Sequence, residues 1–231
     1  MTFKRIAFCA AALALSACQS TGTVPYGHHD GSKDVKHQIN APKTASLNTL
    51  ERQYKRNPDD AEIAASYAVA LRKNDYINRA ETILTPFTEK EDVNAAIHAE
   101  MAAILLEKGD YKAAEKHAGK AVIKNENDFE AYHRLGIALD AQAKHEPAER
   151  AFRKAISLWE GNPTTVMNNL SLNLASQERL DESIEILRQA QELSPGRTEI
   201  KRNLRIITAL QQSHATPVPK PGKKPEPPPS S

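Results

Sequence analysis

FEAYHRLGIALDAQAKHEPAERAFRKAISLWEGN, residues 129–162, is the stretch that decides the fold of this chain. Each half of it carries apolar and small residues at the spacing of one helix face, and the polar segment QAKHEP separates the halves. The residues of these two faces are Tyr132, Leu135, Gly136 and Leu139 in the first half, and Ala148, Phe152 and Ala155 in the second. This spacing predicts two amphipathic helices that pack against each other as an antiparallel pair.

The same pattern recurs along the chain at a nearly constant period. The small residues Ala80, Ala114, Ala148 and Ser183 follow one another at equal steps, with one extra residue before Ser183. A period of about 34 residues with small side chains at fixed points is typical of the tetratricopeptide repeat (TPR). We therefore predict an all-α fold, a right-handed TPR solenoid of antiparallel helix pairs with N- and C-terminal capping helices.

The repeats divide the chain into segments. We expect the repeat domain over residues 44–212, with units at about 61–94, 95–128, 129–162 and 164–197 and a capping helix at 198–212. In the first unit, Pro86 is expected to end the second helix early, because proline interrupts helical hydrogen bonding. In the turn of that unit, Asn74 is expected in the left-handed backbone conformation and Asp75 as the cap of the next helix.

The N-terminus has the build of a secretion signal. Two basic residues, Lys4 and Arg5, precede an apolar run over residues 6–15 that is too short to span a bilayer as a stable helix. The following Leu15-Ser16-Ala17-Cys18 resembles a bacterial lipobox. That resemblance implies removal of residues 1–17 and acylation of Cys18, for example with palmitate, and several acyl chains give stable membrane anchoring. The alternative is an ordinary signal peptide, whose cleavage would leave Cys18 as a free thiol.

Two polar segments flank the repeat domain. Residues 18–43 are rich in Gly, Ser, Thr, His, Lys and Pro without apolar periodicity, and we expect a flexible linker after the acylated cysteine. Gln19, directly after that cysteine, resembles an outer-membrane sorting signal, so the predicted location is the outer membrane, facing the periplasm. Residues 213–231 carry many prolines and lysines and are predicted to form a disordered tail, with a peptide offered to a partner as the other interpretation.

Charge and cysteine content exclude two classes of protein. Without residues 1–17 the chain has 29 basic and 29 acidic residues, so its neutral balance gives no electrostatic support for binding nucleic acid. The two cysteines, Cys9 and Cys18, both precede the repeats, so no disulfide can stabilise the repeat domain. The helices must be held together by packing alone.

No motif points to catalysis. A nucleophile elbow, a phosphate-binding loop and a zinc pattern are all lacking in the sequence. The best candidates for chemistry are His98, His133 and His145. His98 and His133 fall at neighbouring positions of the repeat on first helices of successive units, so they are placed to approach each other. Because no carboxylate pair or cysteine completes a catalytic set, we predict a non-enzyme without cofactor, metal or small-molecule substrate.

The first helices of such units line a concave face, on which we predict a partner-binding groove. The groove residues are Val69, Arg72, Ala103, Leu106, His133, Ile137, Asp140, Asn168 and Leu172. Its middle row is wholly apolar, whereas TPR domains that clamp a terminal carboxylate place Asn and Lys in these rows. The row therefore favours an amphipathic helix or an extended segment with apolar anchors. The alternative is that neighbouring helices bury part of it.

Residues 160–210 resemble the TadD lipoproteins of the tight-adherence (Flp) pilus system. The matching runs are Met167-Asn168-Asn169-Leu170-Ser171-Leu172-Asn173-Leu174, Arg179-Leu180-Asp181-Glu182-Ser183, Leu187-Arg188-Gln189-Ala190 and Arg202-Asn203-Leu204. Ser171 departs from the family, which tends to have glycine there. The resemblance implies a pilotin-like protein that binds the outer-membrane secretin and assists its localisation or assembly.

Two other functions remain open at this point. A type IV pilus pilotin shares the lipobox and the repeats but usually has about six units. An NlpI-like adaptor for peptidoglycan enzymes is the other, and the lysine-rich tail favours it. All three are protein-binding scaffolds at the bacterial envelope.

Overall fold

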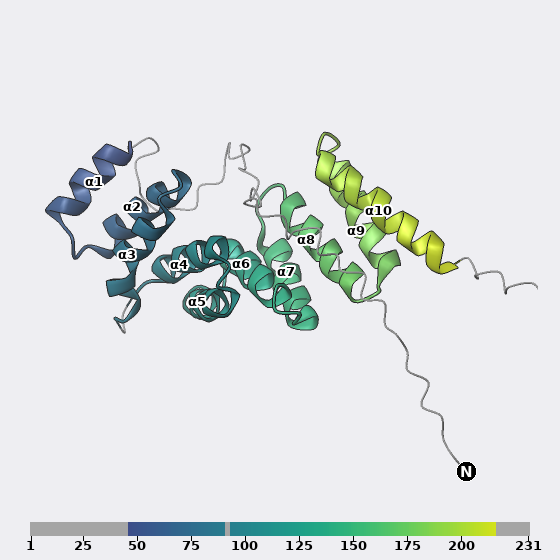
Figure 1. The fold of residues 1–231 in the computed structure, drawn as a ribbon, viewed down its shortest axis with the longest axis horizontal. Coiled ribbons are helices and arrows are strands. Elements are labelled where there is room, and N and C mark those ends of the chain that lie inside the picture. Colours follow the sequence, from purple (N-terminus) through teal and green to yellow (C-terminus); the bar gives the residue numbers. More distant parts are fainter. Residues whose placement is uncertain (1–45, 91–92, 216–231) are drawn as a thin grey trace, which may run out of the picture. The chain divides into compact units, whose positions relative to one another are not determined.

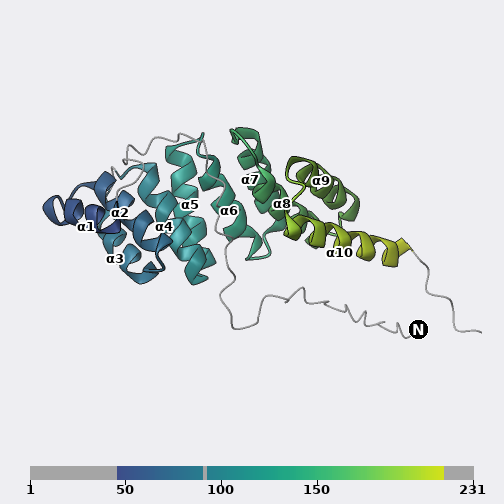
Figure 2. The same ribbon diagram turned by 90° about the horizontal axis from the view of Figure 1, so that it is seen from above.

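The computed structural model describes residues 46–90 and 93–215, and these form ten α-helices and no strand. The helices are α1 (Leu47–Arg56), α2 (Ala61–Lys73), α3 (Ile77–Thr88), α4 (Ala95–Lys108), α5 (Tyr111–Lys124), α6 (Phe129–Asp140), α7 (His145–Leu158), α8 (Thr164–Ser176), α9 (Leu180–Leu193) and α10 (Thr198–Ala215). Figures 1 and 2 show them following one another in a single row, each beside the next. The predicted all-α repeat fold is confirmed.

The helices form four pairs, α2–α3, α4–α5, α6–α7 and α8–α9, with α1 before them and α10 after them. Each helix packs against the next one in the chain. The first helices of successive pairs also contact one another, from α2 to α4, α6, α8 and α10. The backbones of the second helices stay apart within the described part of the chain, where a 3.7 Å side-chain ion pair joins Arg153 on α7 to Glu182 on α9. The first helices therefore line the inner side of the curved stack. We call this side the inner face.

Short polar side chains begin the helices of the stack. The carboxylates of Asp60, Asp110 and Asp128 each accept a hydrogen bond from a backbone N–H of the first turn of α2, α5 and α6, and the amide oxygen of Asn94 does so for α4. These bonds satisfy N–H groups that have no partner within the helix. The caps Asp60, Asn94 and Asp128 recur at the repeat period, so the local sequence sets the start of α2, α4 and α6.

The turns within the pairs share one left-handed residue. Asp75, Gly109, Ala143 and Glu178 stand at the same position of the four units and all have positive φ, from 58° to 76°. The prediction that Asn74 takes this conformation was wrong: its φ is −110°, and its side-chain amide donates a hydrogen bond to the carbonyl of Ala70 instead. The prediction that Asp75 caps the next helix was also wrong, because the N-cap of α3 is Tyr76 and no side chain caps this helix. The geometry of the pair requires the left-handed residue at this place, whatever its side chain.

The prediction that Pro86 ends the second helix of the first unit early was also wrong. Helix α3 continues through Pro86 to Thr88. Phe87, the next residue, is buried in the core with Leu84 and Val93, and this burial stabilises a last turn that lacks one backbone hydrogen bond. A tertiary contact thus overrides the local signal.

Fully buried small side chains let the helices of each pair approach closely. The aligned residues Ala80, Ala114, Ala148 and Ser183 have no exposed surface. The hydroxyl of Ser183 donates a hydrogen bond of 2.7 Å to the carbonyl of Ser171 on α8, so its burial leaves no unsatisfied polar group. Larger apolar side chains, among them Tyr67, Phe152 and Leu187, fill the spaces on either side.

Candidate functional site

All nine predicted groove residues lie on the first helices α2, α4, α6 and α8. They differ in accessibility along the stack. In the apolar row, Ala103 is buried, Val69 and Ile137 are half-buried, and Leu172 is exposed over 40% of its surface. The accessible apolar surface of the row therefore lies toward its C-terminal end.

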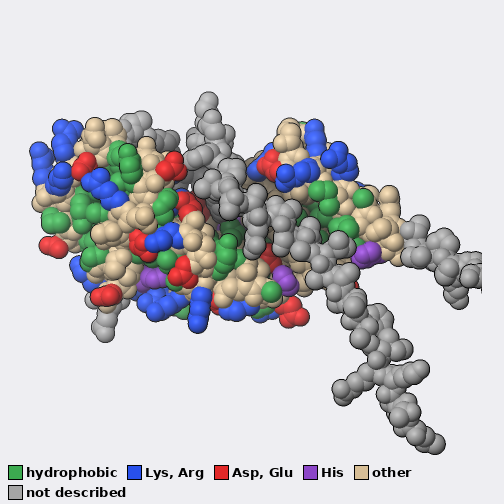
Figure 3. Space-filling view, viewed as in Figure 1, with side chains coloured by type: hydrophobic (Ala, Val, Ile, Leu, Met, Phe, Trp, Pro, Cys, Tyr) green, Lys and Arg blue, Asp and Glu red, His purple; other side chains and the backbone are tan. Residues whose placement is uncertain are grey.

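The apolar row continues onto α10 with a residue that the sequence analysis missed. Ile206 stands one repeat period after Leu172 and is exposed over 42% of its surface, while Ile200 and Ile207 on the same helix are buried. Because α8 contacts both α6 and α10, the row runs from Ile137 through Leu172 to Ile206 across three adjacent helices. Figure 3 shows hydrophobic side chains on the surface of α10. The repeat period itself is the sequence signal for Ile206, because α10 continues the repeat after the fourth unit.

A charged network occupies the other half of the inner face. Arg72 on α2 forms a bidentate ion pair with Glu100 on α4, at 2.6 and 3.2 Å, and a third bond of 2.8 Å to Glu107. The Glu100 residue is only 5% exposed. Burial opposes the charge of Arg72, but the contacts with Glu100 and Glu107 raise its pKa above the usual value. Figure 3 shows basic and acidic side chains side by side over α4.

The network extends onto α6. Arg134 lies 2.6 Å from Glu130, and its charge lowers the pKa of that carboxyl. Burial opposes the charge of Arg134, but Glu130 and then Glu100 raise its pKa. Glu100, Glu130 and Arg134 were absent from the predicted groove, although Glu100 and Arg134 stand at the same position of the repeat in successive units. That position, one residue after Ala99 and His133, carries polar side chains in several units.

Asparagine amides fill the same position nearer the C-terminus. Asn169 holds it in the fourth unit and Asn203 holds it in the capping helix α10. The Asn169 amide nitrogen lies 2.9 Å from Nε2 of His133, and the Asn203 amide donates a 2.8 Å hydrogen bond to Oδ1 of Asn168. Each amide has a donor and an acceptor, the pairing that the backbone of an extended peptide requires. These amides lie on the same helices as the exposed part of the apolar row.

Asp140, another predicted groove residue, takes part in the packing of the turn. Its Oδ1 atom accepts a 2.7 Å hydrogen bond from the buried Asn173 amide and lies 2.9 Å from Nδ1 of His145. The Asn173 amide also donates to the carbonyl of His145 at 3.0 Å. These bonds join α8 to the turn between α6 and α7. The carboxylate of Asp140 is thereby committed to a structural contact.

The histidines do not pair as expected. His98 faces His117 on α5, with 3.2 Å between their Nδ1 atoms, while His133 contacts Asn169 and lies near Phe152 and Trp159. No group of three metal-ligating side chains gathers within residues 46–90 and 93–215. In the same residues, no helix combines the length and the apolar character needed to cross a membrane. Cys18, the linker and the tail lie outside the described residues.

Comparisons with known proteins agree with this architecture. Residues 129–159 and 164–193 each match a sequence model of the tetratricopeptide repeat, and no curated protein sequence matches the chain significantly. A TPR protein of Thermus thermophilus has a similar structure, with a TM-score of 0.58 and 18% identity over 71% of this chain and 89% of its own.

Two further solved structures resemble the chain at similar levels. YrrB, described as a TPR protein with an unusual peptide-binding site, has a TM-score of 0.60 and 20% identity over 72% of this chain and 85% of its own. MamA of Desulfovibrio magneticus has a TM-score of 0.56 and 21% identity over 66% of this chain and 85% of its own. At these identities the likeness concerns the fold. The chain contains tetratricopeptide repeats and has the fold of a TPR protein, an architecture of protein-binding scaffolds.

Proposed function

We propose that this chain is a membrane-anchored scaffold that binds a segment of a partner protein on the inner face of its repeats. The observation that carries the proposal is the apolar row, in which Leu172 and Ile206 are exposed and Ile137 is half-buried, next to the half-buried amide of Asn169 and the buried amide of Asn203. An apolar row beside hydrogen-bonding amides suits an extended or helical segment that offers apolar anchors and a polar backbone. YrrB, which shares the fold, is described as having a peptide-binding site.

The electrostatics of the inner face restrict the partner further. Arg72, Arg134 and Glu100 are already paired within the network, so a bound segment gains little by bringing its own charge there. Affinity must then come mainly from the apolar anchors at α6, α8 and α10. A segment with two or three apolar side chains and few charges fits this surface best.

We further propose that the partner is an outer-membrane secretin of a Flp-type pilus system, whose assembly or localisation the chain assists. The support is the lipobox at Leu15-Ser16-Ala17-Cys18, the polar linker after it, and the resemblance of residues 160–210 to TadD lipoproteins. A type IV pilus pilotin is a close variant of this function. The lysine- and proline-rich residues 213–231 favour the second candidate, an adaptor for peptidoglycan enzymes.

The groove is tested with Leu172→Glu combined with Ile206→Glu. Two carboxylates on exposed positions leave the core untouched but place charge where apolar anchors must be desolvated, so secretin binding should weaken about a hundredfold or more. Leu193→Glu is the matched control, because Leu193 is exposed over 53% of its surface at the end of α9, a second helix. Co-purification with the secretin and circular dichroism are the two measurements. Undiminished binding by a fully helical double variant would contradict the groove.

The anchor is tested separately with Cys18→Ala. If Cys18 is acylated, the substitution should move the protein from the membrane fraction to the soluble periplasmic fraction. Fractionation after a salt wash, followed by mass spectrometry of the N-terminal peptide, measures both the location and the acyl chains. Retention of the variant in washed membranes would refute anchoring through Cys18.

A further inference from the structure

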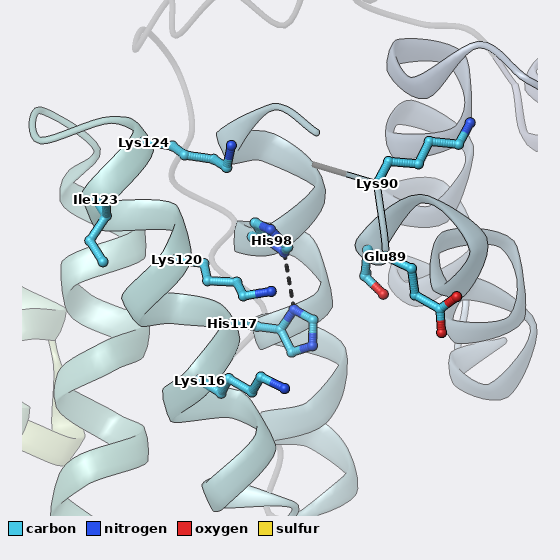
Figure 4. A pocket seen from close by; sticks show the side chains of 9 residues that line it. Glu89, Lys90, His98, Lys116, His117, Lys120, Ile123 and Lys124 are labelled. Carbon is cyan, nitrogen blue, oxygen red and sulfur yellow. Dashed lines mark hydrogen bonds between the residues drawn. The ribbon is translucent and has the colours of Figure 1, made fainter. Parts of the chain in front are cut away.

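A basic hollow lies on the molecule away from the apolar row, between the end of α3 and the helices α4 and α5. Its volume is about 530 Å³. Four lysines reach it: Lys90, just after α3, and Lys116, Lys120 and Lys124 at successive turns of α5. Figure 4 shows Lys116 and Lys120 extending beside the pair of imidazoles formed by His98 and His117. In Figure 3, histidine and basic side chains gather over the same region of the surface.

Among the described residues, basic side chains outnumber acidic ones around this hollow. Glu89 is the one acidic residue among the described residues that line it. Within the described part of the chain, the amino groups of Lys116 and Lys120 form no ion pair, whereas Lys108 pairs with Glu81 and Lys144 with Glu115 nearby. Like charges at four-residue spacing on one helix face repel one another. The arrangement therefore has an electrostatic cost that an anion would remove.

The two imidazoles can adapt to an anion. Their Nδ1 atoms lie 3.2 Å apart and share one hydrogen bond, which requires a proton on one ring and a lone pair on the other. If a further proton binds, this contact persists as a charge-assisted hydrogen bond, which is stronger than the neutral one. Burial first, and then the charge of His117 and of nearby lysines, lower the pKa of His98 to about 4. Burial first, and then Lys120 and Lys116, also lower the pKa of His117. An anion bound in the hollow raises the pKa of both histidines, because its negative charge stabilises their protonated forms.

Comparison of the units within the chain singles out this site. In the third and fourth units, the residues aligned with His117 are the buried Ala151 and the half-buried Ile186, which packs against the core, and those aligned with His98 are Tyr132 and Met167. Only the second unit places two imidazoles at these positions. His98 is 2% exposed, so its burial costs free energy without any packing advantage over the methionine or tyrosine of the other units. The repeat fold gives no reason for this pair.

We propose that the hollow between α3 and α5 binds a phosphate group, with Lys116 and Lys120 as ion-pairing partners and the His98–His117 pair as hydrogen-bond donor. Lysine amino groups are compact, strongly charged donors suited to phosphate oxygens. The hollow is larger than a single phosphate and open to solvent, so the remainder of a phosphorylated ligand has room. Ile123 at its edge, exposed over 79% of its surface, adds one apolar contact.

The first test titrates inorganic phosphate into the full mature chain with the Cys18→Ala substitution and follows the histidine ring signals by nuclear magnetic resonance. Phosphate should shift the signals of His98 and His117 and raise the pKa of both. The variant Lys120→Gln should weaken binding about tenfold, the loss typical of one charge-assisted hydrogen bond. Lys112→Gln is the matched control, because Lys112 is exposed on α5 but does not line the hollow.

The second test separates a soluble phosphate ester from a lipid headgroup. The same protein is sedimented with vesicles of phosphatidylcholine, with and without phosphatidylglycerol. Binding only to the anionic vesicles, lost in Lys120→Gln and kept in Lys112→Gln, assigns the site to a lipid phosphate. Binding of inorganic phosphate alone assigns it to a soluble ligand. If neither probe binds, or if Lys112→Gln loses as much affinity as Lys120→Gln, the proposal is refuted.

Discussion

Two glycines on neighbouring helices provide a sharp test of how tightly the repeats are packed. Gly136 lies within α6 and Gly119 within α5. A Cβ atom added at Gly136 would lie 2.5 Å from two ring carbons of Phe152 on α7, whereas one added at Gly119 would have no neighbour within 4 Å. The same substitution, glycine to alanine, should therefore have opposite effects on the free energy of unfolding.

The magnitudes follow from two opposing contributions. Alanine favours the helix over glycine by about 1 kcal/mol at either position. Phe152 is 1% exposed, so its ring must move by roughly 1 Å into packed surroundings to make room, and overpacking of this kind costs about 1–3 kcal/mol. Because two ring atoms are affected, the overpacking cost at Gly136 should lie at the upper end of this range, about 3 kcal/mol. Gly136→Ala should then destabilise the fold by about 2 kcal/mol and Gly119→Ala should stabilise it by about 1 kcal/mol.

Urea denaturation followed by circular dichroism measures both variants against the parent chain. The expected difference between them is about 3 kcal/mol, well beyond the uncertainty of such extrapolations. If Gly136→Ala proves as stable as Gly119→Ala, Phe152 must yield at little cost. The account of α6 and α7 as a closely packed pair would then be wrong.

Three further predictions concern polar groups. Arg72→Met should destabilise the fold by about 3 kcal/mol in urea, because it leaves the buried Glu100 without its main partner, and Arg72→Met with Glu100→Met should recover most of this loss. Because burial lowers the pKa of His98 from 6.5 to about 4, folding requires the neutral ring. Stability should be complete above pH 6.5 and fall by on the order of 3 kcal/mol toward pH 4, and His98→Met should flatten this slope in parallel denaturation curves. Asn173→Ala should cost about 2 kcal/mol in the same assay, because Asp140 and the carbonyl of His145 lose their donor, whereas Asn169→Ala should cost less.

Sequence patterns predicted those features that depend on residues close in the chain or on the repeat period. Ala80, Ala114, Ala148 and Ser183 marked the helix crossings because only small side chains fit there. Features that depend on contacts between helices were missed. The run of α3 through Pro86 depends on the burial of Phe87, and the partner of His98 depends on how α4 meets α5. Neither contact has a local signature.

The candidate site shows the same limit. The repeat frame placed the nine groove residues on the first helices, but it followed three rows and omitted the adjacent row of Glu100, Arg134 and Asn169. The pairing of Arg72 with Glu100 joins side chains of different units that are far apart in the sequence. Which residues of a row remain accessible depends on the curvature of the stack, and no periodicity in the sequence encodes it.

The one-sided contacts between units have a mechanical consequence. Within the described residues the first helices pack along the stack, whereas the backbones of the second helices stay apart, so the repeats are joined mainly along one edge. Spreading α5 from α7 breaks no backbone packing between them, while separating α6 from α8 breaks the packing that joins the repeats along this edge. A segment bound across α6, α8 and α10 would hold these three helices together and so restrict motion between the C-terminal repeats. Tension applied to a bound partner would then stiffen the C-terminal repeats while the N-terminal ones remain free to flex.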